Sequence, residues 1–204
     1  MNPFRSERLE YRGYHPSEHD DFFARLHTEP VALASSSVSV LRPASNASIE
    51  ETRKDLLENS LLFVMIYRVD ADPSKSEPIG AVSLGSVPSD MVHHRHAGLA
   101  IDIISEHQGK GYGSEALKWT LDWAFLKAGL HRVELEYMEW NEQVRSLYDR
   151  VGFCEEGRRR QCYFRDGRWW DEISMGILEH EWAERRNTGT TIYVDRTVKR
   201  DANN

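Results

Sequence analysis

Three glycines alternate in the segment Gln108-Gly109-Lys110-Gly111-Tyr112-Gly113, which follows an apolar stretch and precedes a helical pattern. Glycine lets a backbone approach a ligand closely, so successive N–H groups of such a turn can surround an anion. A helix that begins near Gly113 adds the positive end of its dipole and its unpaired amides. The number of donors favours a pyrophosphate, while Lys110 either adds charge or faces water.

Two glycine-rich nucleotide motifs do not match this segment. A P-loop ends in Gly-Lys-Ser/Thr, whereas here Gly111 follows Gly109-Lys110. The dinucleotide fingerprint requires Gly-x-Gly-x-x-Gly, and the spacing here is Gly-x-Gly-x-Gly. These mismatches disfavour both nucleotide-binding classes. An ordinary tight turn remains the alternative to an anion site.

Residues that could exchange a proton lie just before this turn. Asp102 interrupts an apolar run, so it needs a partner or a function. His96 closes the cluster His93-His94-Arg95-His96, and histidine titrates near neutral pH. The same cluster also fits an exposed loop. Its His-x-His spacing lacks a third ligand, so no metal site is expected.

Hydrophobic periodicity predicts the elements that position these residues. Strands are expected over 8–14, 61–69, 79–87, 98–104, 132–140, 162–165 and 169–175, and helices over 17–27, 48–59, 114–128 and 141–151. The continuous apolar run 98–104 predicts a strand covered on both faces. A capping box from Ser48 to Glu51 starts the second helix, and Gly129 is placed to end the helix over 114–128 in the left-handed conformation. Asp166-Gly167 predicts a hairpin turn. Residues 28–46 are expected to be irregular and 70–78 an exposed loop.

The central order of strand, glycine turn, helix, strand, helix and hairpin predicts an α/β fold with a mixed sheet. Its 204 residues suit one domain. We expect that domain over 1–184 and a polar tail over 185–204. The net charge of −7 argues against nucleic-acid binding. Only two cysteines and no signal or membrane-spanning run indicate a cytoplasmic protein.

The glycine segment resembles the coenzyme A-binding signature of the GNAT superfamily of N-acetyltransferases, with Gln108, Gly111 and Gly113 at the signature positions. Residues 141–153 are similar to the family's second signature, in which an Asn ends a strand and a helix carries Tyr before Gly-Phe. The hairpin of residues 163–171 resembles that of the ribosomal-protein N-terminal and spermidine acetyltransferase branch. The resemblance covers roughly 8–182 and is strongest over 98–153.

The resemblance implies a mostly antiparallel sheet with two splayed parallel strands, helices on both faces, and acetyl-CoA in the splay. Pantetheine would pair with the backbone of Ile103, Ile104 and Ser105. The pyrophosphate would contact the amides of Gln108, Gly109, Lys110, Gly111, Tyr112 and Gly113. Asn141 would hydrogen-bond the cofactor near the splay.

The resemblance also implies direct attack of an amine on the thioester, with Tyr148 as the acid that protonates the leaving thiolate. By spacing alone Tyr148 fits a core residue better than a catalytic one, and only the Gly-Phe context of the resemblance favours the catalytic role. Relatives often carry a glutamate base at the position of Gly98, which has no side chain. The base stays open among His96, Asp102, Glu136, Glu139 and water.

We therefore expect an acetyl-CoA-dependent N-acetyltransferase acting on a small amine, a polyamine or a peptide amine. The alternative is a coenzyme A-binding sensor of the same fold that has lost catalysis, which the glycine at position 98 supports. The family places the acceptor pocket near Glu29 and residues 31–45. No nucleic acid or membrane partner is expected, and a homodimer stays open.

Overall fold

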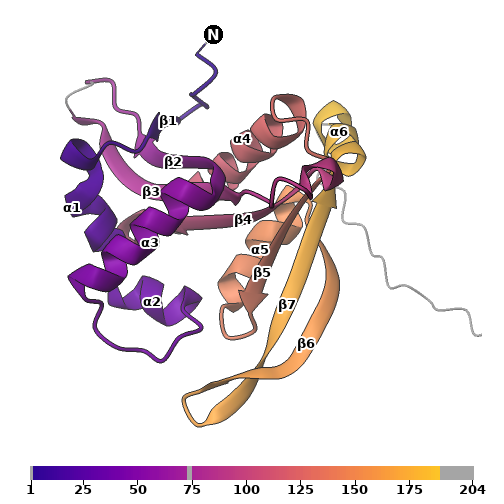
Figure 1. The fold of residues 1–204 in the computed structure, drawn as a ribbon. Coiled ribbons are helices and arrows are strands. Elements are labelled where there is room, and N and C mark those ends of the chain that lie inside the picture. The colour runs from indigo at the N-terminus through magenta and orange to yellow at the C-terminus, as the bar shows by residue number, and fades with distance from the viewer. Residues whose placement is uncertain (1, 73–74, 189–204) are drawn as a thin grey trace, which may run out of the picture.

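A seven-stranded mixed sheet forms the centre of the computed structural model, which describes residues 2–72 and 75–188 (Figure 1). The strands lie in the order β1-β2-β3-β4-β5-β7-β6, and every neighbouring pair is antiparallel except β4 and β5. The strands are β1 (Leu9–Gly13), β2 (Ser60–Arg68), β3 (Glu77–Gly85), β4 (His96–Ile103), β5 (Arg132–Met138), β6 (Cys154–Arg165) and β7 (Arg168–Leu178). The expected mostly antiparallel sheet with one parallel pair is confirmed.

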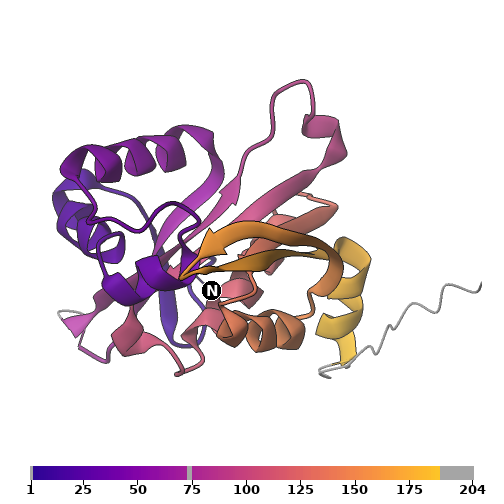
Figure 2. The ribbon, with the colours of Figure 1, turned by 90° about the horizontal axis from the view of Figure 1, so that it is seen from below.

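Helices cover both faces of this sheet, as expected (Figures 1 and 2). They are α1 (Pro16–Leu26), α2 (Pro30–Ser36), α3 (Asn46–Asn59), α4 (Tyr112–Leu126), α5 (Glu142–Val151) and α6 (Glu179–Thr188). On β2, Met65 packs with the α1 residue Phe22, whereas Ile66 packs with the α4 residue Ala116. Because neighbouring strand residues point to opposite faces, α1 and α4 lie on opposite sides of the sheet.

Two glycine-dependent turns are confirmed. Asp166 and Gly167 have φ angles of 51° and 79°, which is the pair of positive values that a type I′ hairpin requires. Gly129 has a φ of 66° just beyond the end of α4, in the left-handed region that glycine adopts at little cost. The β6–β7 hairpin and the end of α4 are therefore where the local chemistry predicts them.

The segment predicted to be irregular contains a short helix, so that prediction was wrong in part. Helix α2 starts at Pro30, where the missing N–H costs nothing. The indole Nε1 of Trp140 donates to the carbonyl oxygen of Ser35 at 3.0 Å and holds the helix against the end of β5. The capping box of α3 was also misplaced by one turn, because Ser45 and Ser48 form it instead of Ser48 and Glu51.

The strand predicted over 162–165 is part of a longer strand, because β6 begins at Cys154. It is the outermost strand of the sheet and its side chains are mostly exposed, so it lacks an apolar alternation. The expected domain boundary at residue 184 falls inside α6, whose Trp182 is buried and donates to Asp122 at 2.9 Å. The single domain over 1–184 stays a prediction, and residues 189–204 of the expected tail lie outside the described residues.

Strand β4 is not covered on both faces, contrary to prediction. Ala97 and Leu99 are buried on one face, whereas Gly98 and Ala100 on the other are exposed and border a cavity. None of the helices in the described part of the chain has the length and apolarity needed to span a bilayer. Within 2–72 and 75–188, no three side chains are grouped to bind a metal.

Candidate functional site

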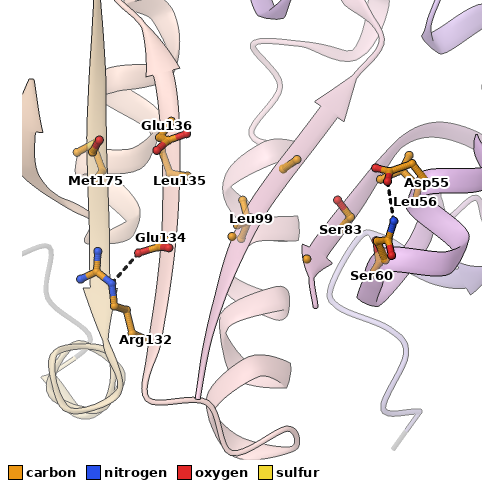
Figure 3. A pocket seen from close by; sticks show the side chains of 15 residues that line it. Asp55, Leu56, Ser60, Ser83, Leu99, Arg132, Glu134, Leu135, Glu136 and Met175 are labelled. Carbon is orange, nitrogen blue, oxygen red and sulfur yellow. Dashed lines mark hydrogen bonds and ion pairs between the residues drawn. The ribbon is translucent and has the colours of Figure 1, made fainter. Parts of the chain in front are cut away.

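The parallel strands β4 and β5 pair over only part of their length. His96, Ala97 and Gly98 pair in register with residues 132–134, and beyond this the two strands are unpaired with each other. Figure 3 shows them leaning apart where β4 continues past Leu99 and β5 past Leu135. An unpaired strand edge presents backbone groups to which an extended ligand can add as a further strand. The splay between β4 and β5 is therefore a site for an extended chain.

The open edge of β4 presents Ile101 and Ile103, not Ile104. The N–H of Ile104 donates to the carbonyl oxygen of Ile79 on β3 at 3.0 Å. Because backbone groups alternate in direction along a strand, the N–H and C=O groups of Ile101 and Ile103 point toward the splay. Of the consecutive residues expected to pair with pantetheine, Ile104 is therefore committed to the sheet. Ile101 was missed by the sequence interpretation.

Ser105 lies at the end of this edge and is engaged by Glu29, the residue before α2. The Ser105 N–H lies 3.2 Å from Glu29 Oε2, and the Ser105 hydroxyl donates to Glu29 Oε1. The Glu29 carboxylate thus occupies one of the amides expected to contact the cofactor. An extended ligand that pairs with Ser105 must displace this carboxylate.

The glycine turn connects this edge to α4. Gly109 and Gly111 have φ angles of 71° and 84°, and Gly111 is the residue that caps the helix. The amides of the first helical turn have no partner within the helix, and no side chain caps them. Left-handed glycines directly before a helix N-terminus form a concave set of N–H donors that suits a phosphate group.

The other residues of the turn have separate roles. The Gln108 side chain donates to the carbonyl oxygen of Ile103 at 2.7 Å, so it braces the turn. Lys110 is exposed, and Tyr112 starts α4. Gly113 does not have a positive φ, and a Cβ there would lie 3.4 Å from Leu147 of α5. Gly113 therefore lies where α4 and α5 pack against each other, and a small side chain there would make an ordinary van der Waals contact with Leu147.

Asn141 stands at the opposite wall of the splay, between β5 and α5. Its N–H donates to the carbonyl oxygen of Met138 at 2.8 Å, which fixes the backbone of the turn. Its side chain makes no hydrogen bond with another described residue and does not cap the helix. The amide group is therefore available to a ligand.

Tyr148 projects from α5 and is buried, with 8% of its surface exposed. Its ring packs against Tyr137 at 6.0 Å and Phe153 at 5.8 Å between centroids. Its hydroxyl makes no hydrogen bond to another described residue. Burial, and next the charge of Asp102, raise the pKa of Tyr148, so the hydroxyl keeps its proton at neutral and mildly alkaline pH.

The carboxylate of Asp102 lies on the same face of β4 as Gly98 and Ala100, because side chains alternate along a strand. Asp102 is half-buried and forms no hydrogen bond or ion pair with a described residue. Burial raises its pKa. A carboxylate that has a raised pKa, no partner among the described residues and a charge that acts on Tyr148 fits a proton acceptor.

Two of the other candidate bases are engaged by neighbouring groups. Glu139 accepts from Arg158 at 2.9 Å and from the Asp171 N–H at 3.2 Å. His96 Nδ1 lies 3.7 Å from a Glu134 oxygen at the paired end of β4 and β5. Glu136, by contrast, is exposed and has no partner among the described residues.

A cavity of about 480 Å³ opens beside the splay, on the α3 side of the sheet (Figure 3). Gly98 and Ala100 form part of its floor, where the absence of larger side chains leaves space. Carboxylates of Asp55, Glu134 and Glu136 border it, and Arg132 donates to Glu134 at 2.8 Å. Among the described residues, Asp55 accepts a hydrogen bond from the neutral Asn59 at 2.7 Å and has no cationic partner. Within this part of the chain, Asp55 and Glu136 are therefore two carboxylates at the cavity without a cationic partner, which suits a cationic ligand.

Residues 35–153, more than half of the chain, match the model of the Acetyltransferase (GNAT) family. The chain belongs to this family. The crystal structure of spermidine N-acetyltransferase from Vibrio cholerae in complex with CoA and spermine superposes with a TM-score of 0.73 and 25% identity. That superposition covers 87% of this chain and 99% of the other.

Curated relatives in the GNAT family match over shorter ranges. Spermidine N(1)-acetyltransferase of Vibrio cholerae is 36% identical over 92 residues, which cover 45% of this chain and 53% of that protein. The [Ribosomal protein uS5]-alanine N-acetyltransferase of Escherichia coli is 29% identical over 115 residues, covering 56% and 58%. The chain thus matches about half the length of each relative. The branch indicated by the resemblance is confirmed.

In this GNAT chain the residues singled out from the sequence gather around one splay. Ser105 and the glycine turn lie at one wall, and Asn141 at the other. Sequence reasoning missed Ile101 and the contact of Arg8 with the turn, which joins groups 102 positions apart. No local pattern signals such a contact, because periodicity reports only on neighbours along one element.

Proposed function

We propose that the protein transfers an acetyl group from acetyl-CoA to a primary amine by direct attack in a ternary complex. The observation that carries this proposal is the continuity of the unpaired β4 edge with the left-handed glycine turn at the start of α4. An extended arm and a pyrophosphate need these two features side by side. When bound, acetyl-CoA supplies the activated thioester.

The residues of this chain fit that donor. The backbone of Ile101, Ile103 and Ser105 would hold the pantetheine arm, with Glu29 displaced from Ser105. The amides of residues 108–113 would hold the pyrophosphate, and the unengaged amide of Asn141 would hold the arm near the splay. The buried wall behind Tyr148 would exclude water from the reacting groups.

Two proton transfers complete the proposed reaction. Asp102 accepts the proton that the amine loses as it attacks, because it is unpaired and its raised pKa brings its basicity nearer neutral pH. Tyr148 donates a proton to the leaving thiolate, because its raised pKa keeps it protonated. Because Asp102 can serve as the base, the absence of a glutamate at position 98 does not imply that catalysis is lost.

The acidic cavity supports a polyamine as the first substrate class and a protein amine as the second. Asp55 and Glu136 can each pair with an ammonium group, which favours an acceptor with more than one positive charge. Relatives named for spermidine and for a ribosomal-protein alanine represent these two classes. We also propose a cytoplasmic setting, supported by Cys154 and Cys162 in the thiol form.

The test of this function is thiol release from acetyl-CoA in the presence of spermidine, a peptide with an N-terminal alanine, a lysine peptide or an amino sugar. We expect release above the amine-free rate with at least one amine, and a product heavier by one acetyl group in the mass spectrum. Spermidine should give the highest kcat/KM. Binding of CoA without release for any of these amines would favour the sensor alternative instead.

Replacing Asp102 by asparagine should lower kcat about tenfold near neutral pH, because water then accepts the proton less effectively. Since burial raises the pKa of Asp102, the wild-type rate should fall as pH drops through a value above that of an ordinary aspartate. In Asp102→Asn this fall in rate at low pH should be absent. The measurement is kcat/KM as a function of pH, with the pKa of the amine substrate determined separately.

The matched control is Glu136→Gln, which neutralises the other unpaired carboxylate beside the splay. We expect a higher KM for the amine and a kcat within about twofold of wild type, because Glu136 is placed to attract the amine. The reverse pattern, with kcat lost in Glu136→Gln and kept in Asp102→Asn, would assign the base to Glu136.

A further inference from the structure

The segment that precedes β1 packs against the glycine turn and the first turn of α4. The indole Nε1 of Trp119 donates to the carbonyl oxygen of Pro3 at 3.0 Å, and the Trp119 ring stacks on Tyr11 at 3.7 Å. These contacts fix the chain on either side of Arg8 to the surface of α4. Arg8 itself lies outside the range that matches the family model.

The guanidinium of Arg8 contacts the glycine turn and the first turn of α4 at three points. Its Nη1 donates to the carbonyl oxygen of Lys110 at 3.0 Å, and its Nε donates to Glu115 Oε2 at 2.8 Å. Its Cζ lies 4.7 Å from the centre of the Tyr112 ring. A Cβ placed on Gly111 would lie 3.3 Å from its Nη2. The guanidinium therefore covers one side of the turn at Gly111.

Glu115 holds Arg8 in this position. Its Oε1 also accepts from the Arg8 N–H at 2.6 Å and from the Ser6 hydroxyl at 2.7 Å. The carboxylate is 13% exposed. Burial opposes its ionisation, but these hydrogen bonds and the Arg8 charge lower the pKa of Glu115 overall. It is thus ionised at neutral pH, and it accepts from both the backbone and the side chain of Arg8.

The contact with Lys110 determines the direction of a peptide plane. In a trans peptide the C=O and the next N–H point in opposite directions. Because Arg8 binds the Lys110 carbonyl oxygen, the N–H of Gly111 must point to the other side of the turn. An anion would meet the turn's amides on that other side, because Arg8 and Tyr112 occupy the side to which the Lys110 carbonyl oxygen points.

We propose that Arg8 is a positioning residue that orients the Lys110–Gly111 peptide so that the Gly111 N–H faces the pyrophosphate of CoA, with Glu115 holding the guanidinium in place. This inference rests on the proposed function, because it assumes that CoA is the donor. Arg8 acts through the turn, and its own contacts are with the protein. Lysine cannot replace it, because a single ammonium lacks the fork that reaches Lys110 and Glu115 together.

The test is calorimetric titration of CoA and of dephospho-CoA into the full chain and its Arg8 and Glu115 variants. Arg8→Ala and Arg8→Lys should both weaken CoA binding about tenfold, the loss expected for a hydrogen bond to a charged group. The dissociation constant of dephospho-CoA should rise by the same factor in these variants, because dephospho-CoA keeps the pyrophosphate. Glu115→Gln should give a smaller loss, and Arg8→Ala with Glu115→Gln should lose little more than Arg8→Ala alone.

The matched control is Arg12→Ala on the adjoining strand β1. Arg12 also pairs with a carboxylate, Glu10 at 2.7 Å, and lies 4.0 Å over a tyrosine ring, Tyr67, but does not contact the turn. Its removal should leave CoA affinity unchanged. If Arg8→Ala is unstable, Arg8→Lys carries the same test.

Three outcomes would overturn the assignment. Unchanged CoA affinity in folded Arg8→Ala, when wild type binds, would refute the role of Arg8 and leave the proposed function standing. A loss with CoA but none with dephospho-CoA would show that Arg8 binds the 3′-phosphate directly. A wild-type chain that binds no CoA would overturn both the proposed function and this role.

Discussion

Tyr148→Phe is expected to lower kcat about 100-fold while CoA affinity stays within about twofold, because only the proton donor for the thiolate is removed. The hydroxyl makes no hydrogen bond with a described residue, so its loss leaves no buried partner unsatisfied. The ring contacts with Tyr137 and Phe153 remain. Stability should therefore change little, and steady-state kinetics with calorimetric titration of CoA measure the two effects separately.

Tyr137→Phe is the matched control for this substitution. Tyr137 is buried in the same cluster and its ring centroid lies 6.0 Å from that of Tyr148, but it has no role in the proposed chemistry. Its kcat should stay near wild type. A kcat for Tyr148→Phe equal to that of wild type would remove Tyr148 from catalysis. A loss of equal size in both variants would point to packing instead of proton transfer.

Gly111→Val should weaken CoA binding by about 100-fold or more, because a β-branched residue strongly disfavours the φ of 84° on which the turn depends. The new Cβ would also lie 3.3 Å from Arg8 Nη2 and push against the guanidinium that orients the turn. If the turn changes its backbone conformation to relieve the unfavourable φ and the close contact with Arg8, its amides no longer point toward the anion. Equilibrium binding of CoA, with the melting temperature of each variant, measures the effect.

Gly129→Val provides the control at the other end of α4. Gly129 has a φ of 66°, so valine there suffers comparable backbone strain, but apart from its chain neighbours no atom of the described residues lies within 4 Å of its Cβ position. It should lower the melting temperature and leave the affinity for CoA intact. CoA binding by Gly111→Val at wild-type strength would show that this turn does not hold the phosphates.

Local sequence chemistry predicted the parts of the fold whose signals are local. The Asp166-Gly167 turn and the glycine after α4 were found because only certain residues adopt a positive φ at low cost. Helix α2 was missed because a seven-residue helix has too few turns to show a periodicity. The length of β6 was missed because an exposed outer strand has no apolar alternation.

The sequence predicted which residues bind acetyl-CoA, but it left open which residue is the base and where the amine binds. Asn141 and the glycine turn follow the two splayed strands, but the sequence could not show that Ile104 is committed to β3 or that Gly113 faces Leu147 of α5. Asp102 was conspicuous as a charge in an apolar run. Choosing it over Glu139 required the knowledge that Glu139 is held by Arg158.

Contacts between distant segments set the limit of prediction. Arg8 and Glu115 are 107 positions apart. In the sequence, each of them is simply a charged residue near the end of a predicted element. Their ion pair stabilises a turn whose glycines alone fit an ordinary bend equally well. Arg8 also donates to the Lys110 carbonyl oxygen within that turn, which is the contact that we propose fixes the direction of the turn's amides.

Calorimetric titration of CoA into the wild-type chain tests the central claim most directly. We expect saturable binding of one CoA per chain, lost in Gly111→Val and kept in Gly129→Val, with a higher melting temperature when the ligand is bound. A wild-type chain that shows neither heat of binding nor a shift in melting temperature at saturating CoA would contradict it.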